Sequence, residues 1–133
     1  METFGAGDLV IAEGRRAGAL YFLKSGTIKI YRCGVVTATI SEPGTVIGEV
    51  SILLDRPHIA EVRAVDECTF HVAADAAAFL REHPNVNLFI CRELAKKVDA
   101  LSCYLADLKA QYGDEDTHMG MMHEVLDTLM HNK

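Results

Sequence analysis

The 133-residue sequence has no long apolar run and no sign of an export signal. Its apolar stretches are only a few residues long, well short of the roughly 20 residues that a membrane-spanning helix needs. The segment from Met1 to Gly5 lacks the basic and apolar regions of a secretory signal. We therefore expect a cytoplasmic protein without a membrane segment.

The sequence is also poor in clustered cysteines. Cys33, Cys68, Cys91 and Cys103 are scattered and form no CxxC pair. Zinc needs Cys and His ligands at close spacing, so no metal site is expected. Without a secretory signal, the thiols are expected to be reduced and mostly packed as small hydrophobic groups.

The sequence also has fewer basic than acidic residues. The net charge is −6, which argues against a protein that binds nucleic acid over its whole surface. A small basic pocket is still compatible with this charge. Half of the residues are apolar and 24% are charged, the balance of a soluble globular domain. The length suits one domain with a sizeable core.

The first half of the chain alternates short β-prone runs with glycines. Several runs alternate apolar and polar residues, which is typical of strands with one buried face. The glycines lie between the runs, where turns need a positive φ or a tight reversal. The expected strands are residues 8–11, 19–23, 27–31, 35–40, 60–64 and 68–72. Short strands at this spacing predict an antiparallel β-roll or small barrel.

The second half has a helical period. Residues 75–82 predict a short helix that ends at His83, because Pro84 disfavours helical geometry in the residue before it. No glycine or proline follows until Gly113, so one long helix over residues 85–112 is expected.

Apolar residues along the long helix recur in steps of three and four, the pattern of a heptad seam. They are Cys91, Leu94, Val98, Leu101, Leu105, Leu108 and Tyr112. This stripe packs either on the chain's own β-roll or on a second copy. A roll of this size covers only the first turns of such a helix, so we expect a homodimer. Its seam is then Leu94, Val98, Leu101, Leu105 and Leu108.

The C-terminal end opens with an acidic break at residues 113–116. Residues 118–131 predict a short amphipathic helix. Its apolar face is Met119, Met122, Val125, Leu126 and Leu129. Methionine and histidine between His118 and His123 suit copper, but a methionine stripe at helical spacing is more often packing surface. We expect two parts: residues 1–112 as roll plus helix, and residues 113–133 as a surface for a protein partner.

The segment from residue 43 to residue 64 carries the chemistry. Gly48 and Glu49 start a short helical turn after a strand, and such a start exposes N–H groups that bind an anion. Arg56, His58 and Arg63 follow within reach and supply positive charge. A carboxylate at Glu49 fits among these groups if it accepts hydrogen bonds from ligand hydroxyls such as those of a ribose. The pattern predicts a pocket for an anion that carries hydroxyl groups.

This segment resembles the phosphate-binding cassette of cyclic-nucleotide-binding domains, the family of the catabolite activator protein and the regulatory subunits of protein kinase A. The matching frame is Gly48-Glu49-Val50, then Pro57-His58-Ile59-Ala60-Glu61-Val62, with a glycine-marked hairpin upstream over residues 20–30. The similarity runs from about residue 5 to residue 108. It implies a stand-alone bacterial-type domain with an antiparallel β-roll, jelly-roll-like, a long C-terminal helix, and cAMP or cGMP as regulatory ligand, cAMP being favoured.

The resemblance also implies roles for single residues. Gly48 and Val50 turn their backbone to the sugar-phosphate, Glu49 holds the ribose 2′-hydroxyl, and the N–H of Ala60 reaches a phosphate oxygen. Pro57 keeps its place in the frame. The family places contacts to the base on the long helix, where the matching positions are Lys97, Leu101 and Ser102.

Two positions depart from the family pattern. His58 replaces the phosphate-binding arginine, and Glu61 replaces a serine or threonine. Histidine is shorter and largely neutral near pH 7, so the change costs on the order of 2–5 kcal/mol of binding free energy. Glu61 either repels the phosphate or pairs with His58 or a nearby arginine. Arg56 is a candidate substitute for the lost arginine.

Three interpretations of the pocket therefore stay open: a cyclic nucleotide bound weakly or in a pH-dependent way, another small ligand, or no ligand on a dimeric adaptor scaffold. DNA binding is not expected, because the residues after Tyr112 are too few and too acidic for a helix-turn-helix. Catalysis is not expected either. His58, His71 and His83 lack the spacing of a metal site, and no catalytic triad is evident.

Overall fold

The protein is described by a computed structural model covering residues 1–112 and 128–129. It divides into two compact units, Met1–Asn87 and Leu88–Lys133, and each is described by itself. The predicted acidic break and most of the predicted helix over residues 118–131, with its His and Met stretch, lie outside the described residues. Thr128 and Leu129, which fall within that prediction, are helical.

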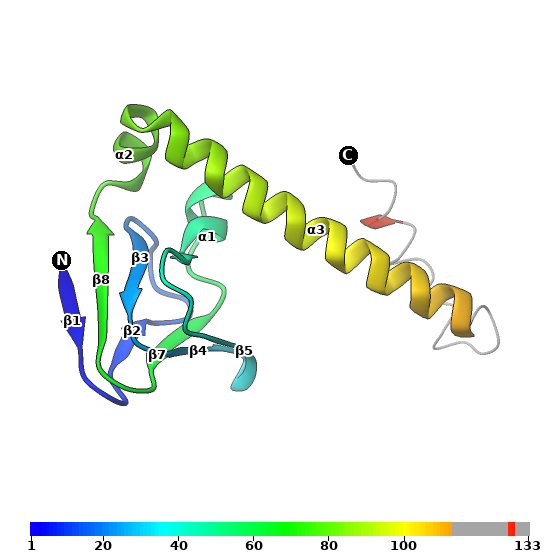
Figure 1. The fold of residues 1–133 in the computed structure, drawn as a ribbon, viewed down its shortest axis with the longest axis horizontal. Coiled ribbons are helices and arrows are strands. Elements are labelled where there is room, and N and C mark those ends of the chain that lie inside the picture. Colours follow the sequence, from blue (N-terminus) through cyan, green and yellow to red (C-terminus); the bar gives the residue numbers. More distant parts are fainter. Residues whose placement is uncertain (113–127, 130–133) are drawn as a thin grey trace. The chain divides into compact units, whose positions relative to one another are not determined.

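The first unit contains two four-stranded antiparallel sheets, with strand orders β1-β8-β3-β6 and β2-β7-β4-β5 (Figure 1). The strands are β1 (Glu2–Phe4), β2 (Leu9–Ile11), β3 (Leu20–Ser25), β4 (Ile28–Arg32), β5 (Val35–Ile40), β6 (Val46–Ile47), β7 (Glu61–Ala64) and β8 (Cys68–Ala73). This arrangement confirms the predicted antiparallel β-roll of jelly-roll type.

All six expected strands are present, but β1 and β6 were not predicted. Both lie at the edges of one sheet, β1 paired to β8 and β6 paired to β3. A strand of two or three residues is too short to show a period of its own. These two elements therefore depend on the longer strands beside them.

The hydrophobic core takes residues from both sheets. Phe70 of β8 and Ile28 of β4 are fully buried, and Val62 of β7 is nearly so. Phe4 and Tyr21 meet the ring of Phe70 edge to face, with centroids 5.6 and 5.9 Å away. Such aromatic pairs add about 0.5–1.5 kcal/mol each beyond their burial, so Phe70 is the centre of the core.

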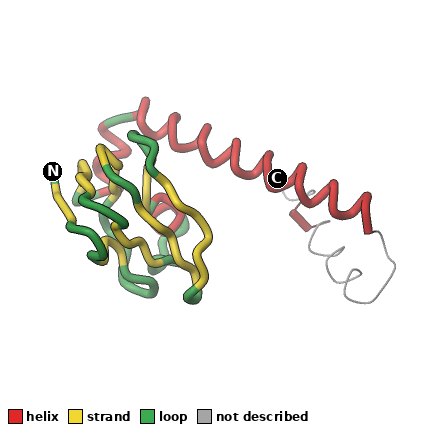
Figure 2. Tube along the Cα trace, turned by 60° about the horizontal axis from the view of Figure 1, so that its bottom comes forward, coloured by secondary structure: helices red, strands yellow, loops and turns green. Residues whose placement is uncertain are grey.

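The helices are α1 (Glu49–Leu53), α2 (Ala76–Glu82) and α3 (Pro84–Tyr112), drawn in red in Figure 2. The carboxylate of Asp75 caps α2 by accepting a hydrogen bond from the Ala78 N–H at 3.1 Å. The helix ends at His83, whose φ of −127° and ψ of 72° are not helical. Pro84 then begins α3, as the missing N–H of proline allows at a first helical position.

The helix α3 has 29 residues and, at 1.5 Å per residue, a length of about 43 Å. Two side chains of the predicted seam are strongly exposed, Val98 at 65% and Leu101 at 48%. Leu94, Leu105 and Leu108 are half-buried. Among the described residues, no helix is long and apolar enough to cross a membrane.

Candidate ligand-binding site

The site is built where strand β6 turns directly into helix α1. Gly48 makes this turn with a φ of +92°, a left-handed conformation that favours glycine. A Cβ at this position would stand 3.3 Å from the carbonyl oxygen of Ala19 and 3.5 Å from Cε1 of His58. The backbone angle therefore favours glycine, the tight approach of the Ala19 carbonyl adds to this preference, and His58 lies beside the start of α1.

Glu49 is the first residue of α1 and is only 8% exposed. Negative charge in the first turn is favoured by the helix dipole. Ser51, two residues further, is 3% exposed, whereas Val50 between them is half-buried. Buried carboxylates are uncommon in proteins unless other groups engage them. The carboxylate of Glu49 therefore requires polar partners at this position.

The loop after α1 is tied to the loop between β2 and β3. The His58 N–H donates to the carbonyl of Arg15 at 2.8 Å, and the His58 carbonyl accepts from the Gly14 N–H at 2.8 Å. Both backbone groups of His58 are thus fixed by one neighbouring loop. Burial lowers the pKa of the imidazole below its usual value of 6.5, which favours the neutral form of the side chain.

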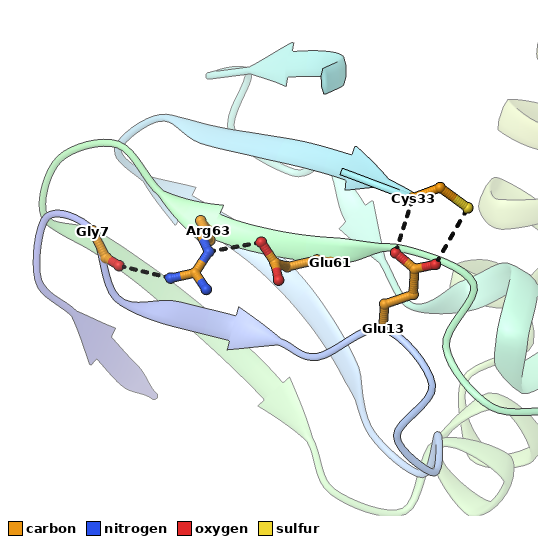
Figure 3. A network of polar contacts seen from close by, with 5 residues as sticks. All are labelled: Gly7, Glu13, Cys33, Glu61 and Arg63. Atoms are coloured by element: carbon orange, nitrogen blue, oxygen red, sulfur yellow. Dashed lines mark hydrogen bonds and ion pairs between the residues drawn. The ribbon is translucent and has the colours of Figure 1, made fainter. Parts of the chain in front are cut away.

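Glu61 pairs with an arginine. Its carboxylate accepts a hydrogen bond from Nε of Arg63 at 2.7 Å, and Arg63 also donates to the carbonyl of Gly7 at 3.4 Å (Figure 3). Along β7, Val62 and Ala64 are buried while Glu61 and Arg63 are half-buried on the other face. Of the two partners considered from the sequence, the arginine is the one that Glu61 contacts.

Arg56 and Pro57 line a cavity of about 640 Å³. Its other lining residues come from within residues 14–18, 51–55 and 75–77. Gly48, Glu49, His58 and Ala60 are not among the residues that line it. Arg56 and Pro57 thus line a hollow to which these four cassette residues do not contribute.

The positions expected to contact a base lie on α3. Lys97 and Leu101 are exposed and Ser102 is half-buried.

The sequence did not predict a link between Glu13 and the β4–β5 hairpin. The Glu13 carboxylate accepts hydrogen bonds from the backbone N–H of Cys33 at 3.1 Å and from its Sγ at 3.9 Å (Figure 3). Cys33 has a φ of +53° at the hairpin turn. No local pattern signals this contact, because the partner is 20 residues away in the sequence.

The expectation that the cysteines are mostly packed as small hydrophobic groups is wrong for three of the four. Cys33, Cys91 and Cys103 are exposed. Cys68 is fully buried and donates from Sγ to the carbonyl of Thr27 at 3.1 Å. Cys33 lies at a turn and the other two on α3, and neither place provides the enclosure that a sheet interior gives Cys68.

Comparison with known proteins identifies the family. The family described as "Cyclic nucleotide-binding domain" matches residues 1–82, more than half of the chain. The chain belongs to the cyclic nucleotide-binding domain family, which confirms the resemblance seen in the cassette residues. Membership in this family supports a ligand-binding regulatory module.

Three similar proteins match different shares of this chain. Glutaminase 2 of Bradyrhizobium diazoefficiens is 36% identical over 115 residues, which cover 76% of this chain but only 18% of that protein. The Thermus thermophilus catabolite activator protein superposes with a TM-score of 0.70 at 24% identity, covering 81% of this chain and 54% of that one.

The third is the regulatory subunit of a cAMP-independent protein kinase A from Trypanosoma cruzi, bound to guanosine. It is 29% identical, with a TM-score of 0.52, and covers 55% of this chain and 26% of that one. The chain thus spans a small to moderate part of each of these relatives.

Proposed function

We propose that the chain is a regulatory module that binds a cyclic nucleotide, cAMP in the first place, beside α1. The observation that carries this proposal is Glu49, an 8% exposed carboxylate at the start of α1 inside the segment matched by the family. A buried acceptor directly after the left-handed Gly48 suits the hydroxyl groups of a ribose. A solvated carboxylate at a surface turn would not need this burial.

The remaining roles follow the family frame. The backbone of Gly48 and Val50 faces the sugar-phosphate, the N–H of Ala60 binds a phosphate oxygen, and His58 lies beside them. Pro57 shapes the loop. Lys97, Leu101 and Ser102 of α3 are proposed to approach the base.

A second candidate ligand is an uncharged nucleoside. Burial lowers the pKa of His58, and Arg63 already engages the carboxylate of Glu61, so the positions that departed from the family pattern supply no permanent positive charge. The similar Trypanosoma cruzi protein is described as cAMP-independent and holds guanosine. Loss of phosphate binding with retention of ribose binding accounts for both observations.

Calorimetric titration with cAMP, cGMP, adenosine and guanosine separates these candidates. If the site is a weakened cyclic-nucleotide site, His58→Arg tightens binding of cAMP at least about tenfold, because arginine supplies a permanent, bidentate charge. Nucleoside affinity should not change. Absence of heat and of thermal stabilisation with all four compounds contradicts the proposal and leaves a scaffold without a ligand.

We further propose that residues 1–112 act as one functional unit in a cytoplasmic homodimer whose seam runs along α3. Residues 113–133 are proposed as the surface for a protein partner. A ligand that favours one arrangement of α3 shifts the population of that arrangement, and this shift is the signal. Binding of specific DNA is not part of the proposal.

A further inference from the structure

The cavity lined by Arg56 is large enough for a metabolite. Its volume of about 640 Å³ falls within the roughly 300–1,000 Å³ of small-molecule pockets. Three segments of the first unit line it: the loop between β2 and β3, the segment from α1 to Pro57, and the start of α2. Of the residues that line it, only Pro57 belongs to the family frame, and the roles proposed for the nucleotide site do not use the others.

Backbone hydrogen bonds hold the walls of the cavity together. The loop between β2 and β3 is fixed at one end by the two bonds between Gly14, Arg15 and His58, each 2.8 Å long. At its other end the carbonyl of Gly18 accepts from the Ala76 N–H at 3.0 Å. The wall at α1 is closed by the Arg56 N–H, which donates to the carbonyl of Ser51 at 3.0 Å. The hollow is therefore shaped by backbone and not by mobile side chains alone.

Two arginines line this cavity, Arg16 and Arg56. Within the part of the chain that the structure describes, neither takes part in an ion pair or a side-chain hydrogen bond. Asp55 and Asp75 also line the cavity, but the Asp75 carboxylate caps α2. Guanidinium groups bind phosphate and carboxylate in a bidentate manner, so two of them in one hollow favour a small anion.

We propose that this cavity is a second ligand site, for a small organic anion bound by Arg16 and Arg56. Phosphate and carboxylate groups share the required chemistry, and Asp55 is placed to accept hydrogen bonds from hydroxyl groups of the same molecule.

The second site is coupled to the proposed nucleotide site, a step that rests on the proposed function. The segment that contributes Ser51 and Arg56 to the cavity begins at Glu49 and ends at His58. Arg16 follows Arg15, whose carbonyl holds the backbone of His58. An anion that draws in Arg16 therefore acts on the loop that positions His58. Such coupling is reciprocal and changes each affinity by roughly 5–150-fold in typical cases.

The test is a titration of the full chain with inorganic pyrophosphate and, separately, with succinate, followed by calorimetry and amide NMR without nucleotide. Binding of either anion, with amide shifts at Gly14 and Gly18, is expected. Arg16→Gln and Arg56→Gln should each weaken it at least fivefold. The matched control Arg32→Gln, an exposed arginine at the end of β4, should leave it unchanged. No binding of either anion, or equal weakening by all three variants, overturns the proposal.

A second titration measures the coupling. The cAMP affinity is determined with and without saturating anion, for the wild type and for Arg16→Gln, and a change in the wild type alone is expected. If both ligands bind without changing each other's affinity, the coupling is wrong. Anion binding without nucleotide binding contradicts only the proposed function, whereas nucleotide binding without anion binding contradicts only the second site.

Discussion

His58 lies directly beside Gly48, with its Cε1 3.5 Å from the point that a Cβ of residue 48 would occupy. The carbonyl oxygen of Ala19 lies 3.3 Å from the same point. A Cβ on residue 48 would therefore crowd the Ala19 carbonyl and bring the side chain into van der Waals contact with the imidazole. This contact makes position 48 a probe of the site and of the fold together.

Gly48→Ala is expected to lower the free energy of unfolding by about 1–3 kcal/mol, because it combines a left-handed backbone with close neighbours. Denaturant unfolding measures this change. Gly34→Ala is the matched control: Gly34 has a φ of +80°, but a Cβ on this residue would have nothing within 4 Å. Equal losses in the two variants would show that the contacts with Ala19 and His58 contribute nothing.

Binding of cAMP should strengthen as the pH falls from 8 to 6. Burial lowers the pKa of His58 in the free protein, and a bound phosphate favours the protonated imidazole, so binding takes up a proton. The affinity then rises by up to about tenfold per pH unit in this range. Calorimetry at several pH values tests this, and His58→Gln should flatten the profile. A wild-type affinity that does not vary with pH contradicts the role given to His58.

The stability of the ligand-free protein should change with pH in the opposite sense. The pKa of His58 is lower when folded than when unfolded, so the unfolded chain takes up the proton first as the pH falls. The contribution of the neutral imidazole is complete above the unfolded pKa of about 6.5 and is lost below it. The range from pH 7.5 to pH 5.5 extends about one unit to either side of that pKa. Over this range the urea midpoint should therefore fall more in the wild type than in His58→Gln. An equal fall in both excludes His58 as the cause.

Glu49→Gln should weaken nucleotide binding by about tenfold or more, since a hydrogen bond to a charged acceptor is worth about 1.5–3 kcal/mol. Glu61→Gln is the control. Its carboxylate is engaged by Arg63 on β7, so its loss should change the affinity by less than about twofold. The two dissociation constants, measured side by side, test the assignment. A larger effect at Glu61 than at Glu49 would reverse the roles of the two carboxylates.

Val98→Glu should weaken the proposed homodimer at least about tenfold, because it puts a charge at an apolar seam position of α3. Val98 is 65% exposed, so the substitution should leave the monomer folded. Ala100→Glu places the same charge off the seam and serves as the control. Light scattering over a concentration series gives the oligomeric state. A dimer that survives Val98→Glu, or no dimer in the wild type, contradicts the seam.

Local patterns were sufficient for most of the fold. The period-2 runs located six strands, and the change to a helical period located α2 and α3 with the break at His83 and Pro84. The strands β1 and β6 were not predicted, because they are short and form through their pairing with β8 and β3. The turn at Gly48 and Glu49 was predictable, because a glycine stands between a strand and a short apolar run there.

Period and spacing along the chain were thus enough to define the β-roll, the long helix and the family frame from Gly48 to Glu61. Which distant groups meet is a property of the folded chain: His58 meets the loop at Arg15, and Arg16 meets Arg56 around a cavity. The protonation of His58 also depends on the folded chain, since burial lowers its pKa. Burial and pairing arise from segments far apart in sequence, and no local pattern contains them.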